Sequence, residues 1–192
     1  MMATASSNDV KRIHPHKFTL WVAMGSIVMM FAGLTSAYIV KKNQANWLEF
    51  SLPGVFWYST IVIIASSVTI HLALKSFKAR EMGRYRLLIT ITAALGLLFM
   101  ILQTMGFFSL EAKNIHLTGP NSNAASSFLL VITSLHMLHI LGGVIAILVI
   151  FLRAFNMKFK SYSSVPIEVI STYWHFVDIL WIYLFIFFNW LR

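Results

Sequence analysis

Five long apolar runs limit the possible folds of this chain more than any other feature. Each run has about 20 residues or more, the length that an α-helix needs to cross roughly 30 Å of hydrocarbon. Only 11% of the residues are charged, against about 25% in a soluble domain. The sequence therefore predicts an all-α integral membrane protein, with transmembrane helices at residues 18–40, 54–74, 87–108, 128–151 and 169–190.

The chain reads as one transmembrane domain preceded by a short polar segment. Residues 1–17 are small, polar or basic, and we expect most of this segment to be flexible. They lack the apolar core and small-residue cleavage site of a signal peptide. Residues 18–192 show neither a fixed-period repeat nor a composition shift that would mark a second domain.

The basic residues cluster between the apolar runs and indicate an orientation. Eleven Lys and Arg residues fall in the N-terminal segment and the second and fourth loops, whereas four fall on the opposite side. Because cytoplasmic loops retain positive charge, the N-terminus is expected inside and the C-terminus outside. The net charge of +9 forms no basic stripe, so nucleic acid is not an expected partner.

Ionisable side chains lie deep in the last two runs. His136 and His139 are near the middle of the fourth, and His175 and Asp178 are in the fifth. Residues three apart share a helix face. Since charged groups inside a membrane are costly without a partner, we expect Asp178 to hydrogen-bond with His175 or a fourth-run histidine. Two further polar residues are also expected to be buried or structural: Gln103 within the third run and Glu168 just before the fifth.

The same residues allow three other interpretations. His136, His139, His175 and Asp178 could form a metal site, since imidazoles and a carboxylate are a reasonable ligand set. A haem pair would need matching histidines two or three turns apart on facing helices. A proton relay would need a continuous ionisable chain. Structural hydrogen bonding is favoured over all three, and the lack of cysteine excludes disulfides and thiolate sites.

Two motifs resemble subunit III of the haem-copper cytochrome c oxidases in its short five-helix form. The first is Tyr-Trp-His-Phe-Val-Asp-x-x-Trp at residues 173–181, with Glu168 seven residues before His175. The second is Thr-x-x-His-x-x-His-x-x-Gly-Gly at residues 133–143. The resemblance extends over almost the whole chain from Phe18.

The resemblance implies a subunit with no catalytic or redox centre of its own. It would contact subunit I, which holds the haems and copper, and associate with subunit II, other oxidase subunits and a larger respiratory supercomplex. It also implies a two-helix group and a three-helix group separated by a cleft filled with structural phospholipids. Arg153 matches a family arginine that contacts a lipid phosphate, and a topology-setting role is equally compatible with its position.

Some positions depart from the family pattern. Ile27 stands where a buried glutamate is usual in the first helix, so any role of that carboxylate is in doubt here. Ser59 replaces a usual asparagine, and Ser134 and Met137 replace glycines next to the first histidine of the second motif.

The expected function is a stabilising, non-catalytic subunit III of a respiratory oxidase, most simply in a bacterial inner membrane. The alternatives are the same subunit in a quinol oxidase, a nitric oxide reductase accessory protein, and an independent His/Asp membrane metalloenzyme.

Overall fold

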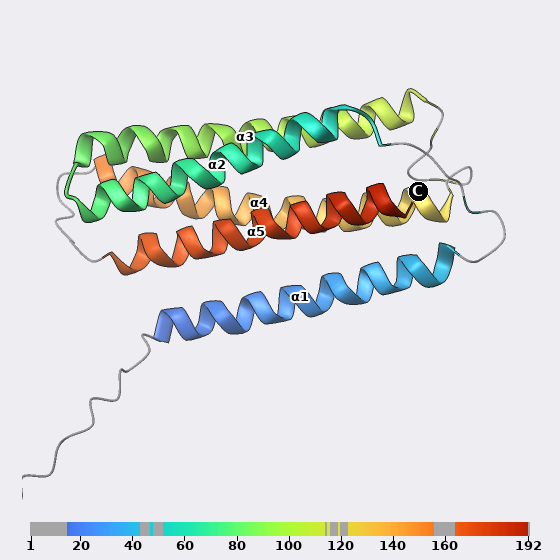
Figure 1. The fold of residues 1–192 in the computed structure, drawn as a ribbon, viewed down its shortest axis with the longest axis horizontal. Coiled ribbons are helices and arrows are strands. Elements are labelled where there is room, and N and C mark those ends of the chain that lie inside the picture. Colours follow the sequence, from blue (N-terminus) through green and yellow to red (C-terminus); the bar gives the residue numbers. More distant parts are fainter. Residues whose placement is uncertain are drawn as a thin grey trace, which may run out of the picture.

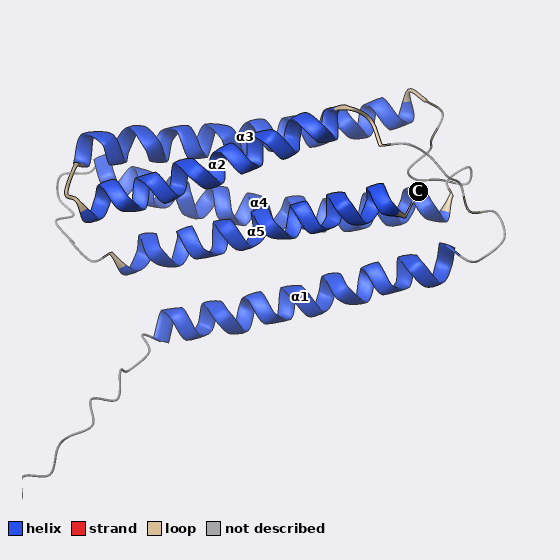
Figure 2. Cartoon of the chain, in the orientation of Figure 1, coloured by secondary structure: helices blue, strands red, loops and turns tan. Residues whose placement is uncertain are grey.

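The structure is a computed structural model that describes residues 15–42, 47, 52–113, 115, 119, 123–155 and 164–191. Within these residues all regular structure is helical (Figures 1 and 2). The five helices are α1 (Pro15–Lys42), α2 (Val55–Lys78), α3 (Met82–Glu111), α4 (Ala124–Phe155) and α5 (Val165–Trp190). All five are long and apolar enough to cross a membrane, which confirms the predicted fold class.

The helices extend beyond most of the predicted ends. The sequence bounds stop at the first cluster of charged or polar residues, whereas α3 and α4 continue about one turn further at each end. Helix α1 begins at Pro15, so residues 15–17 are helical and do not belong to the expected flexible segment. Proline fits there because the first helical turn leaves its N–H groups unbonded. Residues 1–14 lie outside the described residues.

Helices α2, α3, α4 and α5 form a four-helix bundle, and α1 lies against one side of it (Figure 1). Around the bundle, α2 packs on α3, α3 on α4, α4 on α5 and α5 on α2. Helix α1 contacts α4 and α5, and the described parts of α1 and α2 do not touch. The expected separation of a two-helix group from a three-helix group is therefore wrong. Polar contacts of α2 with α3 and α5 explain why α2 joins the bundle.

The outer surface of the helices is apolar, as lipid contact requires. Exposed side chains include Ile61 on α2, Phe108 on α3, Leu138 on α4 and Ile179 on α5, each more than 60% accessible. In a soluble protein such a surface would favour aggregation, whereas in a bilayer it meets acyl chains.

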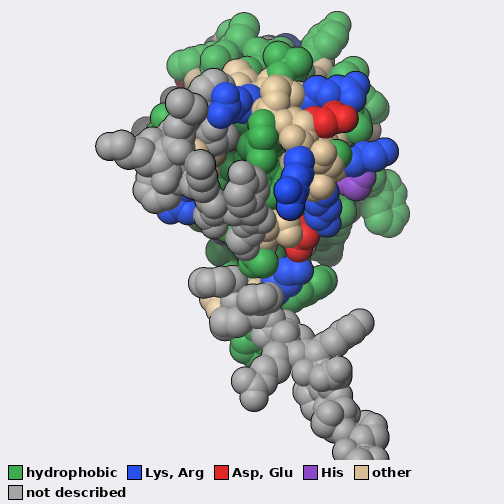
Figure 3. All heavy atoms as spheres, turned by 90° about the vertical axis from the view of Figure 1, so that its left-hand side faces the viewer, with side chains coloured by type: hydrophobic (Ala, Val, Ile, Leu, Met, Phe, Trp, Pro, Cys, Tyr) green, Lys and Arg blue, Asp and Glu red, His purple; other side chains and the backbone are tan. Residues whose placement is uncertain are grey.

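Charged side chains gather at one end of the bundle. Figure 3 looks at this end and shows Lys and Arg side chains close to acidic ones. There Glu168 on α5 pairs with Lys17 on α1 at 2.9 Å and with Lys78 on α2 at 3.0 Å. One carboxylate thus links the ends of three helices.

The turn from α2 to α3 at this end contains a residue with a left-handed backbone. Arg80 has φ of 59° and directly follows Ala79, the C-cap residue of α2. The Arg80 N–H donates to the Phe77 carbonyl, and the Glu81 N–H donates to the Ser76 carbonyl. This pair of bonds is a Schellman motif, in which glycine is the usual residue at the left-handed position.

Candidate functional site

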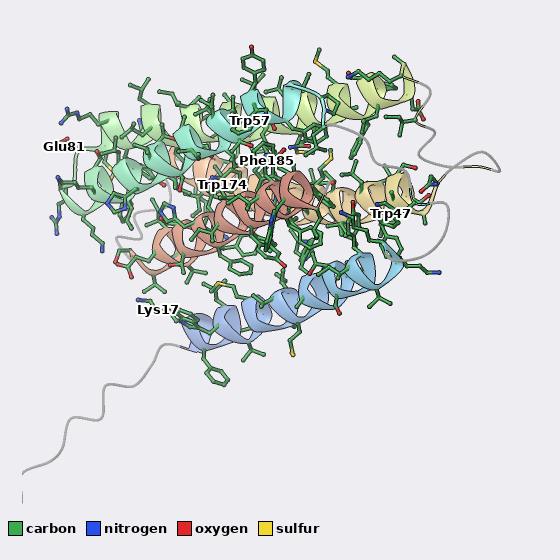
Figure 4. The ribbon with its side chains drawn as sticks, turned by 45° about the vertical axis from the view of Figure 1, so that its right-hand side comes forward. Lys17, Trp47, Trp57, Glu81, Trp174 and Phe185 are labelled. Carbon is green, nitrogen blue, oxygen red and sulfur yellow. The ribbon has the colours of Figure 1, made fainter. Side chains whose placement is uncertain are left out.

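Trp174 lies at the centre of the four-helix bundle (Figure 4). Its indole Nε1 donates a hydrogen bond of 3.0 Å to the hydroxyl of Ser66 on α2. The ring also lies against two glycines: a Cβ on Gly96 of α3 would be 2.8 Å from Cη2, and one on Gly143 of α4 would be 2.9 Å from Cζ3. One side chain of α5 therefore contacts the three other bundle helices. Small residues at both positions permit this close approach.

Trp181 repeats this arrangement two turns further along α5. Its Nε1 donates to the Thr60 hydroxyl of α2 at 3.0 Å. The indole stacks on Phe56 with ring centroids 6.1 Å apart, and meets Phe99 edge-on at 5.3 Å. Trp174 and Trp181, seven residues apart on α5, therefore bond to Ser66 and Thr60, which are six residues apart on the antiparallel α2.

His136 is fully buried next to Trp181. The two rings are stacked, with centroids 5.3 Å apart, and the edges of Phe31 and Phe99 complete its surroundings. Neither imidazole nitrogen has a hydrogen-bond partner in the described part of the chain. Its contacts are those of a core aromatic ring.

Asp178 is 2% exposed, and neither carboxyl oxygen is hydrogen-bonded to a described residue. The expected bond to His175 or to a histidine of α4 is therefore not found. The physical reason lies on the neighbouring turns: Trp181 covers the His136 ring, and His175 is engaged with α2. The Ser67 hydroxyl of α2 is the polar group close to Asp178.

The other two histidines are partly buried and serve different contacts. His175 Nδ1 is 2.6 Å from the Ser67 hydroxyl, a hydrogen bond whose donor depends on the imidazole tautomer. His139 Nδ1 is 2.7 Å from the Leu135 carbonyl of its own helix. The Tyr173 hydroxyl of α5 donates to the His139 carbonyl at 3.0 Å. Over the described ranges no three His, Asp or Glu side chains come together as metal ligands, so the proposed four-residue metal set is not assembled.

The remaining candidate residues lie in three different places. Gln103 is buried and its amide donates to the Ser59 hydroxyl at 3.1 Å, joining α3 to α2. Glu168 is at the charged end of the bundle, partly buried by its two lysine partners. Arg153 is exposed in the last turn of α4.

Sequence reasoning missed the interhelical role of the small hydroxyl residues of α2. Ser66, Ser67 and Thr60 each bond to a side chain of α5. Thr69 is similarly 2.8 Å from Thr92 of α3. The signal that could have revealed them is the six-residue spacing of Thr60 and Ser66 on α2, which is close to the seven-residue spacing of Trp174 and Trp181 on the antiparallel α5.

These features define an integral membrane protein whose five helices bury an aromatic, hydrogen-bonded interior. The family model described as "Cytochrome c oxidase subunit III" matches residues 49–192. The chain belongs to the cytochrome c oxidase subunit III family. It is therefore a subunit of a haem-copper oxidase, of a type without its own catalytic centre, and it associates with other oxidase subunits.

Individual relatives match the chain over most of its length. A probable cytochrome c oxidase subunit 3 of Nocardia farcinica is 30% identical, covering 96% of this chain and 95% of the relative. The corresponding protein of Mycobacterium tuberculosis is 32% identical over the same shares. A cytochrome bo(3) ubiquinol oxidase subunit 3 of Buchnera aphidicola is 29% identical, covering 88% of this chain and 83% of the relative.

Proposed function

We propose that this chain stabilises a respiratory cytochrome c oxidase by covering part of subunit I, the subunit that holds the haems and copper. Subunit II and the other oxidase subunits would complete the assembly, which would extend into a supercomplex in a bacterial inner membrane. The observation that supports this proposal is that tryptophan side chains fill the interior of the bundle. Trp174 and Trp181 fill the space between α2, α3 and α4.

Several buried polar groups of the chain join its helices, which fits a structural role. Gln103 and the α2 hydroxyls join helices to one another. His136 is enclosed by aromatic rings. Cross-helix hydrogen bonds in membranes contribute about 0.6 kcal/mol each on average, so several of them fix the relative positions of the helices. A rigid bundle of this kind can present a constant surface to its partner.

The proposed orientation places the charged end of the bundle on the cytoplasmic side. Glu168, Lys17 and Lys78 lie at that end, together with Arg84 on α3 and Arg153 on α4. Positive charge retained in the cytoplasm supports this assignment. The N-terminus would then be inside and the C-terminus outside.

Structural phospholipids are proposed ligands of the outer surface. Arg153 is exposed in the final turn of α4, at the depth where lipid headgroups meet the helices. A guanidinium can bind a phosphate through two parallel hydrogen bonds, which an ammonium group cannot do.

The test is purification of the tagged chain from mildly solubilised membranes, followed by identification of the co-purifying subunits and their haem spectrum. The account predicts an oxidase containing subunit I that oxidises reduced cytochrome c. A complex that oxidises only quinol would contradict the cytochrome c assignment and favour the quinol oxidase alternative. Recovery of the chain without any haem-containing subunit would contradict the proposed function itself.

A further inference from the structure

A pair of histidines lies on the surface where α2 meets α5. The rings of His71 on α2 and His175 on α5 have centroids 6.1 Å apart, with planes inclined at 53°. His71 is exposed and His175 is partly buried. Ser67, one turn from His71 on α2, bonds to Nδ1 of His175. This hydrogen bond fixes the ring orientation of His175, so the two histidines have a defined arrangement on this surface.

The surface around the pair is otherwise apolar. Val68 on α2 is 56% exposed, Ile64 is 46% exposed, and Ile179 on α5 is 66% exposed. These residues share the outward faces of the two helices with the histidines because they are three, four or seven positions apart. We call this surface the His71 face. Toward its other end, Trp57 and Phe185 meet edge-on with centroids 4.8 Å apart (Figure 4).

An imidazole exposed to acyl chains is unfavourable. Ionisable side chains within membrane helices normally face protein or a water-filled cavity, where hydrogen bonds offset their desolvation. His71 lies two turns before Lys78, the last residue of α2, and so about 10 Å inward from the ion pairs at the helix ends. At that depth a lipid headgroup reaches the side chain less readily than a neighbouring helix does.

The charge near this face is positive. Lys75 is exposed one turn from His71, and Lys78 lies beyond it. At this end of α2, Glu168 is already shared by Lys17 and Lys78, and Glu81 pairs with Arg84. An acidic side chain on a partner would complement this surface.

We infer that the His71 face is the surface on which a transmembrane helix of another oxidase subunit docks, with an acidic side chain of that helix bonded to His71. This inference rests on the proposed function, which supplies the partner, and adds which side of the chain the partner covers. The apolar residues Val68, Ile64 and Ile179 would pack against the incoming helix. His71 and His175 would fix its depth and register.

The first test places the photo-crosslinking residue p-benzoylphenylalanine at Val68, in the complete oxidase within its membrane. The same residue at Ile145, which is 53% exposed on α4, is the matched control. The inference predicts a covalent adduct with another oxidase subunit from position 68, and adducts with lipid from position 145. Only lipid at position 68, or a second copy of this chain there, would overturn it.

The second test compares His71→Leu with His71→Gln in the purified complex. We expect His71→Leu to lower the retention of the partner subunit about threefold at a fixed detergent concentration, the change given by loss of one interhelical hydrogen bond of about 0.6 kcal/mol. His71→Gln, which can still hydrogen-bond, should retain more of the partner. Equal retention by wild type and His71→Leu would contradict a docking role.

Failure of this inference is distinguishable from failure of the proposed function. If haem-containing subunits co-purify with the chain while position 68 reaches only lipid, the oxidase assignment holds and the docking surface is elsewhere. If no oxidase subunit co-purifies with the wild-type chain, the proposed function fails before the crosslink is read.

Discussion

Trp174 and Gly143 are in direct contact: a Cβ atom on Gly143 would lie 2.9 Å from Cζ3 of the indole and 3.3 Å from Cε1 of Tyr173. The adjacent Gly142 faces away, with nothing within 4 Å of the corresponding position. Two neighbouring glycines of α4 therefore differ in what they do. Gly143 allows α5 to approach α4, whereas Gly142 is on the outer side of the helix.

This difference predicts opposite outcomes for two alanine substitutions. Gly143→Ala should lower the thermal stability of the detergent-solubilised chain by about 1–3 kcal/mol, because it overpacks a fully buried contact. Gly142→Ala should be neutral or stabilising by up to about 1 kcal/mol, because alanine is the better helix former. Thermal denaturation followed by circular dichroism measures both. Equal effects of the two substitutions would mean that Trp174 does not pack on Gly143.

The hydrogen bond between Trp174 and Ser66 supports a second prediction. Ser66→Ala leaves the buried indole N–H without its acceptor, so we expect a loss of about 0.6–3 kcal/mol of stability. Ser26→Ala on α1 is the control, because that hydroxyl is exposed and bonds to carbonyls of its own helix. Tryptophan fluorescence emission reports the environment of the indole, and we expect it to shift to the red in this variant. Unchanged stability and emission in Ser66→Ala would show that this bond contributes nothing.

The left-handed residue in the α2–α3 turn gives a substitution that should stabilise the chain. Arg80→Gly relieves a backbone conformation that costs roughly 1 kcal/mol for a residue with a Cβ. Arg84→Gly, in the first turn of α3, should instead destabilise by a similar amount through lower helix propensity and loss of its ion pair with Glu81. Thermal melts of the two variants should therefore shift in opposite directions. A lower melting temperature for Arg80→Gly would contradict the left-handed assignment.

The orientation can be measured because the chain has no cysteine. Single cysteines at Glu81 and Lys113 lie beyond opposite ends of α3 and are both exposed. An impermeant maleimide added to intact cells should label position 113, and should label position 81 only after permeabilisation. Labelling of both from one side would contradict the transmembrane path of α3, and the reverse pattern would invert the proposed orientation.

The number and type of helices could be predicted because hydropathy acts locally: a run of about 20 apolar residues satisfies its backbone groups only as a helix. The grouping of the helices could not be predicted in this way, because it depends on which helix faces pack against each other. Contacts such as Ser66 with Trp174 join residues more than 100 positions apart, and the resemblance supplied a grouping that α2 does not follow.

The candidate site shows the same limit at the level of single side chains. The depth of His136 and Asp178 follows from their positions along the helices, so their burial could be anticipated. Their partners could not, because rotation of α4 and α5 about their axes decides which groups meet. Trp181 takes the place beside His136 that a hydrogen-bonding group was expected to fill.

The central claim is that this chain protects an oxidase without taking part in its chemistry. Its most direct test is oxygen consumption over many turnovers by the purified oxidase, with and without this subunit. Because Trp174 and Trp181 fill the bundle interior and Ile27 replaces the usual glutamate, we expect similar initial rates in the two preparations. The preparation that lacks the chain should then lose activity progressively during turnover. Complete inactivity from the first turnover would contradict the account, and so would an identical active lifetime.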